Sequence, residues 1–304
     1  MEIRNDKARR FQALHAADEL FVMANAWDLG SLRMFEAIGF AALATTSAGF
    51  AYSLGRSDGT GSVGRDEMLA HVAELAGATS LPVSADMEAG YGADPDAVAD
   101  TLRRVLSTGA AGCSLEDATY DPARPLFSVE EAAERIAAAR AAIDAAGVPF
   151  VLTARAECFL MGTPDPLADA IRRLQAYQDA GADCLYAPGL TTKDEIAAVL
   201  SSVDRPVNVL AGLGPAPLAI ADLADLGVRR VSIGSGLAQF AYAMAIDAAR
   251  EVLDAGTFGY LDKTAGMGRI NRFFETGELP PIARNRRGDL IAEGRSRIPP
   301  DAEF

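Results

Sequence analysis

The sequence predicts an α/β protein, and within that class a (β/α)8 TIM barrel. Short apolar runs recur along its 304 residues, and each run is followed by a segment rich in Ala, Leu, Glu and Arg. The apolar runs are continuous and do not alternate with polar residues, which is typical of parallel strands buried on both faces. Eight such strand–helix units over roughly 250 residues match this barrel in number and in length.

The apolar runs mark the expected strands, which lie within residues 21–28, 41–50, 82–92, 111–120, 149–159, 183–190, 206–214 and 229–236. The segments between them place apolar residues at helical spacing and close on glycine, as helix C-caps do. Ser128 and Glu131 form the pattern of a capping box at the start of one helix. An open doubly wound sheet is the competing architecture, but no GxGxxG turn follows the first run, FVMANAWDLG.

We expect one barrel domain over residues 1–255 and a C-terminal arm over residues 256–304. A long helical stretch, LAQFAYAMAIDAAREVLDAG, follows the eighth run, and a tail rich in Pro and Arg begins at about Leu279. This tail is interpreted as an extended arm or a partner-wrapping segment rather than as a second domain.

Composition limits the classes of partner. The chain has 42 acidic and 28 basic residues and a net charge of −14, which argues against nucleic acid and anionic membranes as partners. Cys113, Cys158 and Cys184 show no CxxC pairing, so buried and reduced thiols are expected. No run resembles a signal peptide or approaches the roughly 18 apolar residues of a membrane span. We therefore expect a cytoplasmic protein.

Carboxylates gather at the expected carboxyl ends of the strands, where barrels of this kind place their chemistry. Asp58, Asp86, Glu88 and Glu116 are predicted to converge on one point. Without a cation these acids would raise one another's pKa values. An all-oxygen cluster without histidine suits a hard cation, Mg²⁺ or Mn²⁺. The alternative is that individual acids cap helices or pair with nearby arginines.

Arg155 ends the apolar run VLTARAECF, where an unpaired arginine would be costly to bury. One interpretation is that it pairs with Glu157 or Glu116. The other is that its guanidinium binds a substrate carboxylate in a bidentate manner. His15 and His71 fall within helical patterns and no lysine ends a strand, so histidine-based and Schiff-base mechanisms are not expected.

Taken together, the motifs NAWD, TTSAGF with the downstream GRSDG, DMEAGYG, SLED, TARAE and SIGSG resemble those of the isocitrate lyase/phosphoenolpyruvate mutase superfamily. The resemblance covers most of the chain. It implies an Mg²⁺-dependent barrel that binds small 2-oxo acids or their enolates. It also implies that the last helix is exchanged between neighbouring barrels in a homodimer or homotetramer.

The resemblance assigns roles to individual residues. Asp86 matches the direct metal ligand, and the water-mediated metal partners fall on Asp58, Glu88 and Glu116. A carboxylate-binding loop falls on Ser47 and the amides near Ala48 and Gly49. Arg155 matches the arginine that holds the substrate carboxylate, and Asp58 is also expected to act near the reacting group.

The loop after the fourth strand, EDATYDPARPLFSVEE, departs from the superfamily pattern because it contains no Lys, Cys or Asn. Tyr120 and Arg124 are the candidate gate residues there. The sequence therefore favours an Mg²⁺-dependent carbon–carbon lyase that acts on a small 2-oxo or 2-hydroxy carboxylate, by decarboxylation or retro-aldol cleavage. The alternatives are a phosphonopyruvate-type mutase or hydrolase, a non-catalytic 2-oxo-acid binder, and a sugar-phosphate enzyme with SIGSG as its phosphate cradle.

Overall fold

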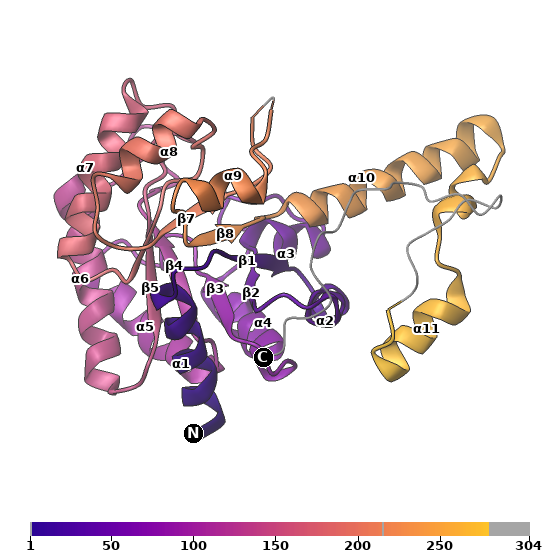
Figure 1. Ribbon diagram of the computed structural model, residues 1–304, viewed down its shortest axis with the longest axis horizontal. Coiled ribbons are helices and arrows are strands. Elements are labelled where there is room, and N and C mark those ends of the chain that lie inside the picture. Colours follow the sequence, from indigo (N-terminus) through magenta and orange to yellow (C-terminus); the bar gives the residue numbers. More distant parts are fainter. Residues whose placement is uncertain (1, 215, 280–304) are drawn as a thin grey trace. The chain divides into compact units, whose positions relative to one another are not determined.

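The computed structural model describes residues 2–214 and 216–279, and its centre is a closed barrel of eight parallel strands (Figure 1). Each strand pairs with the next along the chain, and the eighth pairs with the first. The predicted (β/α)8 barrel is therefore confirmed. The strands are β1 (Phe21–Ala26), β2 (Ala42–Thr45), β3 (Val83–Asp86), β4 (Gly112–Glu116), β5 (Val151–Arg155), β6 (Cys184–Tyr186), β7 (Val207–Leu210) and β8 (Arg230–Ser232).

Helices follow the strands around the barrel and precede the first one. They are α1 (Glu2–Ala16), α2 (Leu29–Ile38), α3 (Ser47–Ser53), α4 (Arg65–Gly77), α5 (Pro95–Thr108), α6 (Val129–Ala146), α7 (Pro166–Asp179), α8 (Lys193–Leu200), α9 (Ile220–Asp225) and α10 (Gly236–Arg250). A π-helical turn (Glu251–Ala255), a 3-10 turn (Gly259–Lys263) and α11 (Met267–Thr276) come after them.

Local sequence signals explain where several helices begin and end. The predicted capping box is present at α6, where the Ser128 side chain accepts from the Glu131 N–H and the Glu131 side chain accepts from the Ser128 N–H. The run expected as a strand over 41–50 is shorter than predicted, since β2 stops at Thr45 and Thr46 caps α3. A helix therefore starts directly at the carboxyl end of β2.

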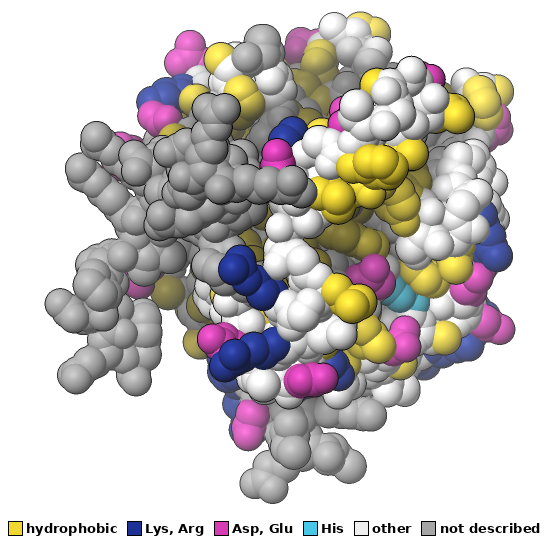
Figure 2. Space-filling model, turned by 90° about the vertical axis from the view of Figure 1, so that its right-hand side faces the viewer, with side chains coloured by type: hydrophobic (Ala, Val, Ile, Leu, Met, Phe, Trp, Pro, Cys, Tyr) yellow, Lys and Arg dark blue, Asp and Glu magenta, His cyan; other side chains and the backbone are white. Residues whose placement is uncertain are grey.

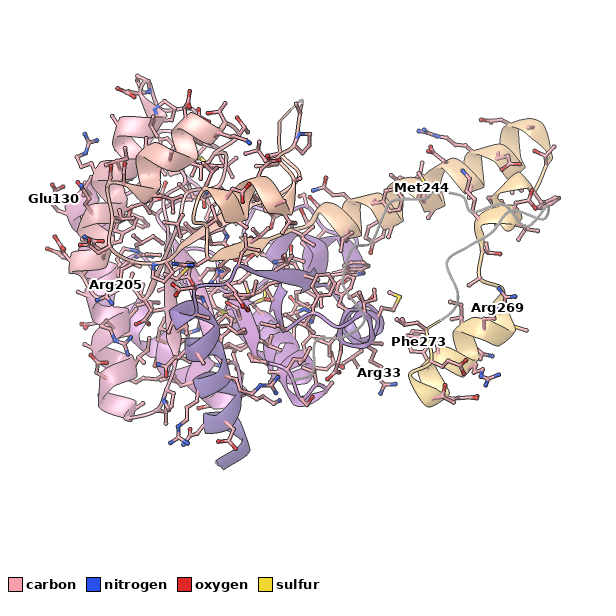
Figure 3. All side chains as sticks on the ribbon, in the orientation of Figure 1. Arg33, Glu130, Arg205, Met244, Arg269 and Phe273 are labelled. Carbon is pink, nitrogen blue, oxygen red and sulfur yellow. The ribbon has the colours of Figure 1, made fainter. Side chains whose placement is uncertain are left out.

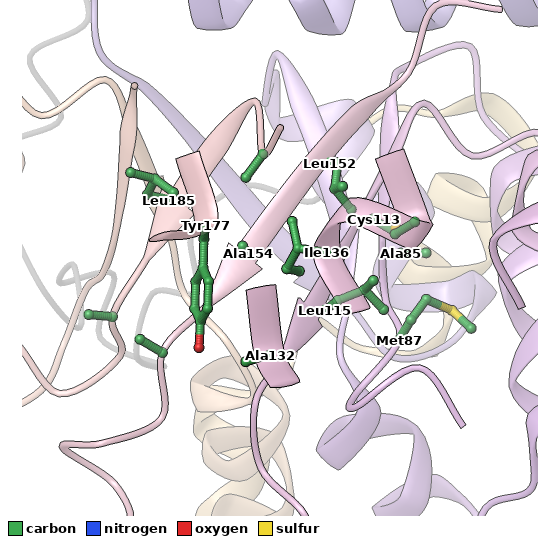
Figure 4. Packing of buried hydrophobic residues seen from close by; sticks show 14 of the residues in the cluster. Ala85, Met87, Cys113, Leu115, Ala132, Ile136, Leu152, Ala154, Tyr177 and Leu185 are labelled. Carbon is green, nitrogen blue, oxygen red and sulfur yellow. The ribbon is translucent and has the colours of Figure 1, made fainter. Parts of the chain in front are cut away.

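The hydrophobic core lies between the outer faces of the strands and the surrounding helices. Cys113 and Leu115 of β4 point outward into it and pack with Ile136 of α6 and neighbouring residues (Figure 4). The alternate residues of the same strand, Ser114 and Glu116, point into the barrel. The three cysteines are buried and free, as expected. The small, polar residues that face the barrel interior leave room for a cavity there.

Contacts divide the chain into a unit spanning Met1–Gln239 and a second unit that begins at Phe240. The described part of the second unit is helical, and its apolar residues include Met244 on α10 and the ring pair Phe273–Phe274, with centroids 4.9 Å apart, on α11 (Figure 3). Figure 2 shows hydrophobic side chains gathered on one face of the molecule. The predicted boundary between residues 255 and 256 stays a prediction, and most of the predicted Pro/Arg-rich arm lies outside the described residues.

Within the described ranges, no helix combines the length and apolar character that a membrane crossing requires.

Candidate active site

A cavity of about 500 Å³ opens at the carboxyl ends of the strands and reaches down into the barrel. Its lining carries more acids than bases, and the basic residues are Arg155 and Arg230. Of the residues predicted for the site, the cavity brings together Ser47, Ala48, Asp58, Asp86, Glu116, Tyr120 and Arg155. Asp121 and Glu157 also line it.

Asp86, the last residue of β3, is held by donors from two sides. Its Oδ2 accepts from both the backbone N–H and the hydroxyl of Ser47, at 3.0 Å each. Its Oδ1 accepts from Arg155 Nη1 at 3.1 Å and from the Ser114 hydroxyl at 3.4 Å. The Asp86 N–H donates to Thr45 Oγ1 at 2.8 Å. The start of α3 and the strands β4 and β5 thus fix this carboxylate at the mouth of the barrel, and β2 holds its backbone.

Arg155 is surrounded by carboxylates. Its Nη1 lies 2.9 Å from Glu116 Oε2 and 3.1 Å from Asp86 Oδ1, and its Nε donates to Glu157 Oε1 at 2.9 Å. Its guanidinium lies 5.2 Å from the ring centroid of Tyr186. The pairing with Glu116 and Glu157 that the sequence left open is present. It does not exclude substrate binding, because a guanidinium has five N–H donors and can exchange one acceptor for another.

The acids outnumber the cations that could neutralise them. Burial raises the pKa of Asp58, and the nearby charge of Asp86 raises it further. Burial first, and then Asp86, raises the pKa of Glu88 to about 7, although Glu88 lies beside the cavity and not in its lining. Burial also raises the pKa of Glu116 despite the opposing effect of Arg155. This excess of negative charge is the condition that a bound divalent cation relieves.

The donor set fits Mg²⁺ better than a metal held only by protein ligands. In the part of the chain that the structure describes, no group of three or more His, Cys, Asp or Glu side chains is placed to hold a metal ion on its own. Mg²⁺ usually keeps several waters and binds through one or two carboxylates. An oxygen-only site with dispersed acids is therefore compatible with it.

The loop after β3 has an unusual backbone. Glu88 and Tyr91 have positive φ angles of 46° and 55°, and Gly90 between them has a φ of 81°. Among the described residues, the only other non-glycine residue with a positive φ is Tyr120. The hydroxyl of Tyr91 donates to Glu88 Oε1 at 3.1 Å. Left-handed backbone outside glycine costs energy and often occurs at functional sites, so the loop needs support from its surroundings.

Arg135 of α6 supplies that support. It is 4% exposed, and its Nη1 donates to the carbonyl oxygens of Gly92 and Ala93 at 2.7 and 2.6 Å. Its Nη2 donates to the carbonyl of Ala89. The guanidinium also lies over the ring of Phe127, 4.1 Å from its centroid. Arg135 therefore ties the loop that carries Glu88 to α6.

The two predicted gate residues lie in different surroundings. Tyr120 lines the cavity and its hydroxyl donates to Glu116 Oε1. Arg124 is not among the lining residues, and its Nη1 binds Glu131 Oε1 at 2.9 Å and Oε2 at 3.1 Å, near the start of α6. The role of Arg124 at the gate stays a prediction.

In the predicted carboxylate-binding loop, Ser47 and Ala48 line the cavity but Gly49 does not. The Gly49 N–H donates to Thr46 Oγ1 at 3.2 Å, which caps α3. A Cβ at this position would lie 2.6 Å from Thr46 Cγ2 and 2.9 Å from Trp27 Cβ, so only glycine fits without a shift. Gly49 shapes the turn, and its predicted contact with a substrate stays a prediction.

Sequence reasoning missed part of the site and its support. Ser114 contacts Asp86, and its inward position could have been found from its spacing two residues before Glu116. Asp117 is the last residue of the motif SLED and follows β4 directly. It accepts from the Tyr177 hydroxyl at 2.5 Å, from Arg173 Nη1 at 2.9 Å and from the Glu157 N–H at 2.8 Å. These partners come from distant parts of the chain, so no local signal points to them.

Comparisons with known proteins show the family to which the chain belongs. The family model of phosphoenolpyruvate phosphomutase matches residues 11–253. An uncharacterised protein of Mycobacterium tuberculosis is 37% identical over 245 residues, which cover 80% of this chain and 89% of its own length. An oxaloacetate decarboxylase of a Bradyrhizobium species is 32% identical over 173 residues, 55% of this chain and 56% of that protein.

Solved structures show the same fold. A Burkholderia cenocepacia protein with only a provisional lyase/mutase name has a TM-score of 0.87 at 46% identity, covering 92% of this chain and 100% of its own. Phosphonopyruvate hydrolase in complex with oxalate and Mg²⁺ has a TM-score of 0.75 at 26% identity, covering 84% and 90%. The chain therefore belongs to the isocitrate lyase/phosphoenolpyruvate mutase superfamily, and it is an enzyme of the carbon–carbon lyase type.

Proposed function

We propose that this enzyme cleaves a carbon–carbon bond in a small 2-oxo or 2-hydroxy carboxylate, with Mg²⁺ or Mn²⁺ as its cofactor. The proposal rests above all on the excess of carboxylates around Arg155 in one cavity of about 500 Å³. The similarity to an oxaloacetate decarboxylase and to a hydrolase that binds oxalate with Mg²⁺ supports the same substrate class. Decarboxylation and retro-aldol cleavage are both compatible with it.

Asp86 would hold the metal directly, and Asp58, Glu88 and Glu116 would hold it through water. A bound divalent cation would act as a Lewis acid and stabilise the negative charge that develops as the bond breaks. Two observations support this assignment. The site offers only oxygen ligands, and the pKa values of Asp58, Glu88 and Glu116 are raised.

The chain's own residues would bind and orient the substrate. Arg155 would exchange part of its contact with Asp86 and Glu116 for the substrate carboxylate. Ser47 and Ala48 would border that carboxylate at the start of α3. Holding the reacting bond in one orientation contributes to the rate because less entropy is lost when the transition state forms.

Tyr120 would close the cavity from the loop after β4. Its hydroxyl already lies against Glu116, so it can hold a proton near the reacting carbon and limit the access of water. Arg124 would assist only if it released Glu131. This division of roles makes Tyr120 the more important residue of the gate.

Phosphorus–carbon bond cleavage is a second candidate because the fold matches that of phosphonopyruvate hydrolase over 84% of the chain. A phosphonyl group carries more charge than a carboxylate and needs more donors. Its observable sign would be phosphate release from phosphonopyruvate.

We also infer a cytoplasmic homo-oligomer. The second unit exposes large apolar side chains to solvent, and exposed apolar patches are typical of surfaces that bind another subunit. These residues include Phe240, Ile246, Leu253, Phe258 and Met267.

The test is turnover of oxaloacetate, isocitrate, methylisocitrate, a 2,3-dialkylmalate and phosphonopyruvate, each with Mg²⁺ and with EDTA. Pyruvate is measured with lactate dehydrogenase, and glyoxylate, succinate and phosphate directly. We expect EDTA-sensitive carbon–carbon cleavage of at least one of the first four. Phosphate release with none of the others cleaved would replace the proposal by the second candidate, and EDTA-resistant turnover would remove the metal from it.

A further inference from the structure

The lower part of the cavity contains a buried arginine that the proposed reaction does not use. Arg230 of β8 is 3% exposed and lines the cavity. Its Nε donates to Asn208 Oδ1 at 2.9 Å, and its Nη1 donates to Thr153 Oγ1 at 2.8 Å. The Nη1 also lies 3.2 Å from His15 Nε2. Its position at the start of β8 places it below the acids at the mouth.

None of these partners carries a negative charge. The described residues form no ion pair with Arg230, whereas Arg155 has three carboxylate partners and Arg173 has two. His15 is neutral, since burial and then Arg230 lower its pKa to about 3. The guanidinium of Arg230 thus lies inside the barrel without a carboxylate partner among the described residues. Burying an uncompensated charge is among the most costly arrangements in a protein.

One end of this guanidinium is free to bind something else. No hydrogen bond of Arg230 Nη2 is found within the described residues. In the described part of the chain, the fully enclosed side-chain nitrogens without a hydrogen-bond partner are His71 Nε2, Arg140 Nε and Arg173 Nε, so Arg230 Nη2 is not sealed by protein. The cavity that Arg230 lines is the space available to it.

Several residues that line this cavity are small, which leaves room for a ligand group. The cavity lining includes the small residues Ala44, Ser84, Ser114 and Ser232 at barrel positions where many barrels place Val, Ile or Leu, together with the larger Met23 and Leu210. Hydroxyl groups can solvate a carboxylate from its sides while the guanidinium neutralises its charge.

We propose that the floor of the cavity is a second anion site, in which Arg230 Nη2 binds a carboxylate or an inorganic anion of similar size. The carboxylate source would be the distal acid group of the substrate, which rests on the proposed function and would make that substrate a dicarboxylate. The inorganic source does not depend on the proposed function.

The first experiment needs no metal and no substrate. The thermal midpoint of the metal-free enzyme is measured in EDTA with increasing formate at constant ionic strength, with gluconate as the larger balancing anion. A ligand that binds only the folded state raises the midpoint, and we expect a rise of about 2 °C or more in the wild type. Arg230→Gln should abolish the rise, and His15→Gln, which leaves the charge in place, should retain it.

The second experiment compares ligand pairs of equal length in the presence of Mg²⁺. Calorimetry gives the affinity for 2-oxoglutarate relative to 2-oxopentanoate, and for oxaloacetate relative to 2-oxobutyrate. If the distal carboxylate reaches Arg230, at least one diacid binds about tenfold or more tightly than its monoacid, and Arg230→Gln removes the difference. A formate effect that depends on Arg230 without this preference identifies the inorganic source.

A crystal soaked in bromide supplies a test that does not depend on a variant folding. An anomalous peak beside Arg230 Nη2 supports the site. The proposal is wrong if formate leaves the midpoint unchanged, the ligand pairs bind alike and no bromide lies at the floor. Failure of the proposed function would instead appear as absent or EDTA-resistant turnover, with the formate effect retained.

Discussion

Glu116 and Asp117 are consecutive acids at the end of β4, yet the structure places them in opposite environments. Glu116 points into the barrel, where it shares Arg155 with Asp86 and Glu157. Asp117 points outward, where Arg173, the Tyr177 hydroxyl and the Glu157 N–H satisfy it. One acid belongs to a group with too few cations, and the other belongs to a balanced buried network.

This difference distinguishes acids that can take part in metal binding from acids that only stabilise the fold. A balanced network has no capacity left for a ligand, because each acceptor already has its donor. Burial raises the pKa of Asp58, Glu88 and Asp117, but the neighbouring charge of Asp86 raises it further at Asp58 and Glu88, whereas the hydrogen bonds and Arg173 oppose the rise at Asp117. A group with excess negative charge is stabilised by added protons or a cation. Burial alone would not have distinguished the two acids, since both are buried.

The largest effect on activity is expected from a substitution among the acids that face the barrel interior. Asp86→Asn keeps the shape of the side chain but removes the charge that would hold the metal. We expect kcat/KM to fall by about 10³-fold or more, with a thermal midpoint close to that of the wild type. The measurement is steady-state kinetics on the best substrate of the panel, and nearly unchanged turnover would contradict the assignment of Asp86.

A substitution of the outward-facing Asp117 should lower the stability of the fold and leave metal binding nearly unchanged. Asp117→Asn leaves the buried Arg173 without its main counter-charge, which should cost about 3 kcal/mol in the free energy of unfolding. Denaturant titration measures that cost. Mg²⁺ affinity should change by less than about threefold. If Asp117→Asn were as stable as the wild type but no longer bound Mg²⁺, Asp117 and not the group around Glu116 would belong to the metal site.

A third variant tests whether loop support matters to the site. Arg135→Met removes the donors to the carbonyls of the loop after β3, so Glu88 should be less well positioned. We expect Mg²⁺ affinity to weaken by about tenfold.

Arg140→Met is the matched control for this variant. Arg140 lies on the same helix but pairs with Asp144 and Asp183, which are outside the cavity lining. Both variants should lose stability, and only Arg135→Met should weaken metal binding. An equal loss of metal affinity in both would show that general destabilisation is the cause.

The pH dependence follows from Glu88. Its pKa is about 7 in the fold against an ordinary value of 4.5, so the folded state holds a proton that the unfolded state has released between these values. The stability that this proton provides is complete below pH 4.5 and is lost as pH rises through about 7. Metal-free enzyme should therefore lose stability over this range, and Mg²⁺ affinity should rise. Glu88→Gln should flatten both profiles, and unchanged profiles would count against the assignment.

The smallest effect is expected at Arg124. Its contact with Glu131 is a surface ion pair, with side chains 57% and 45% exposed, and such pairs contribute little. Arg124→Ala should change kcat/KM by less than about twofold and stability by less than about 1 kcal/mol. Tyr120→Phe, which removes the hydroxyl that faces Glu116, should reduce turnover more. The reverse order would show that Arg124 moves into the site during the reaction.

Sequence patterns predicted the barrel and much of the candidate site because both depend on local order. An apolar run that ends in an acid places that acid at the carboxyl end of a strand, and closing the barrel then brings such ends together. Asp86, Glu116 and Arg155 meet for this reason.

Other features depend on distant partners or on fine geometry. The pattern did not show that Asp117 meets Arg173 of α7, or that the Gly49 amide is used by Thr46. It did not show that Arg230 has no carboxylate partner among the residues that the structure describes, since such an absence is visible only in three dimensions. The pairing of Arg124 with Glu131 was easier to predict from sequence, because the capping-box pattern already places Glu131 in the first turn of α6, seven residues after Arg124.

The most direct test of the account is Mn²⁺ binding by electron paramagnetic resonance, with free Mn²⁺ measured at increasing enzyme concentration. The wild type and Asp117→Asn should each bind one Mn²⁺ per chain, displaceable by Mg²⁺, and Asp86→Asn should bind none in the same range. Binding that survives in Asp86→Asn, or is lost only in Asp117→Asn, would contradict the claim that the excess of acids around Arg155 marks the metal site.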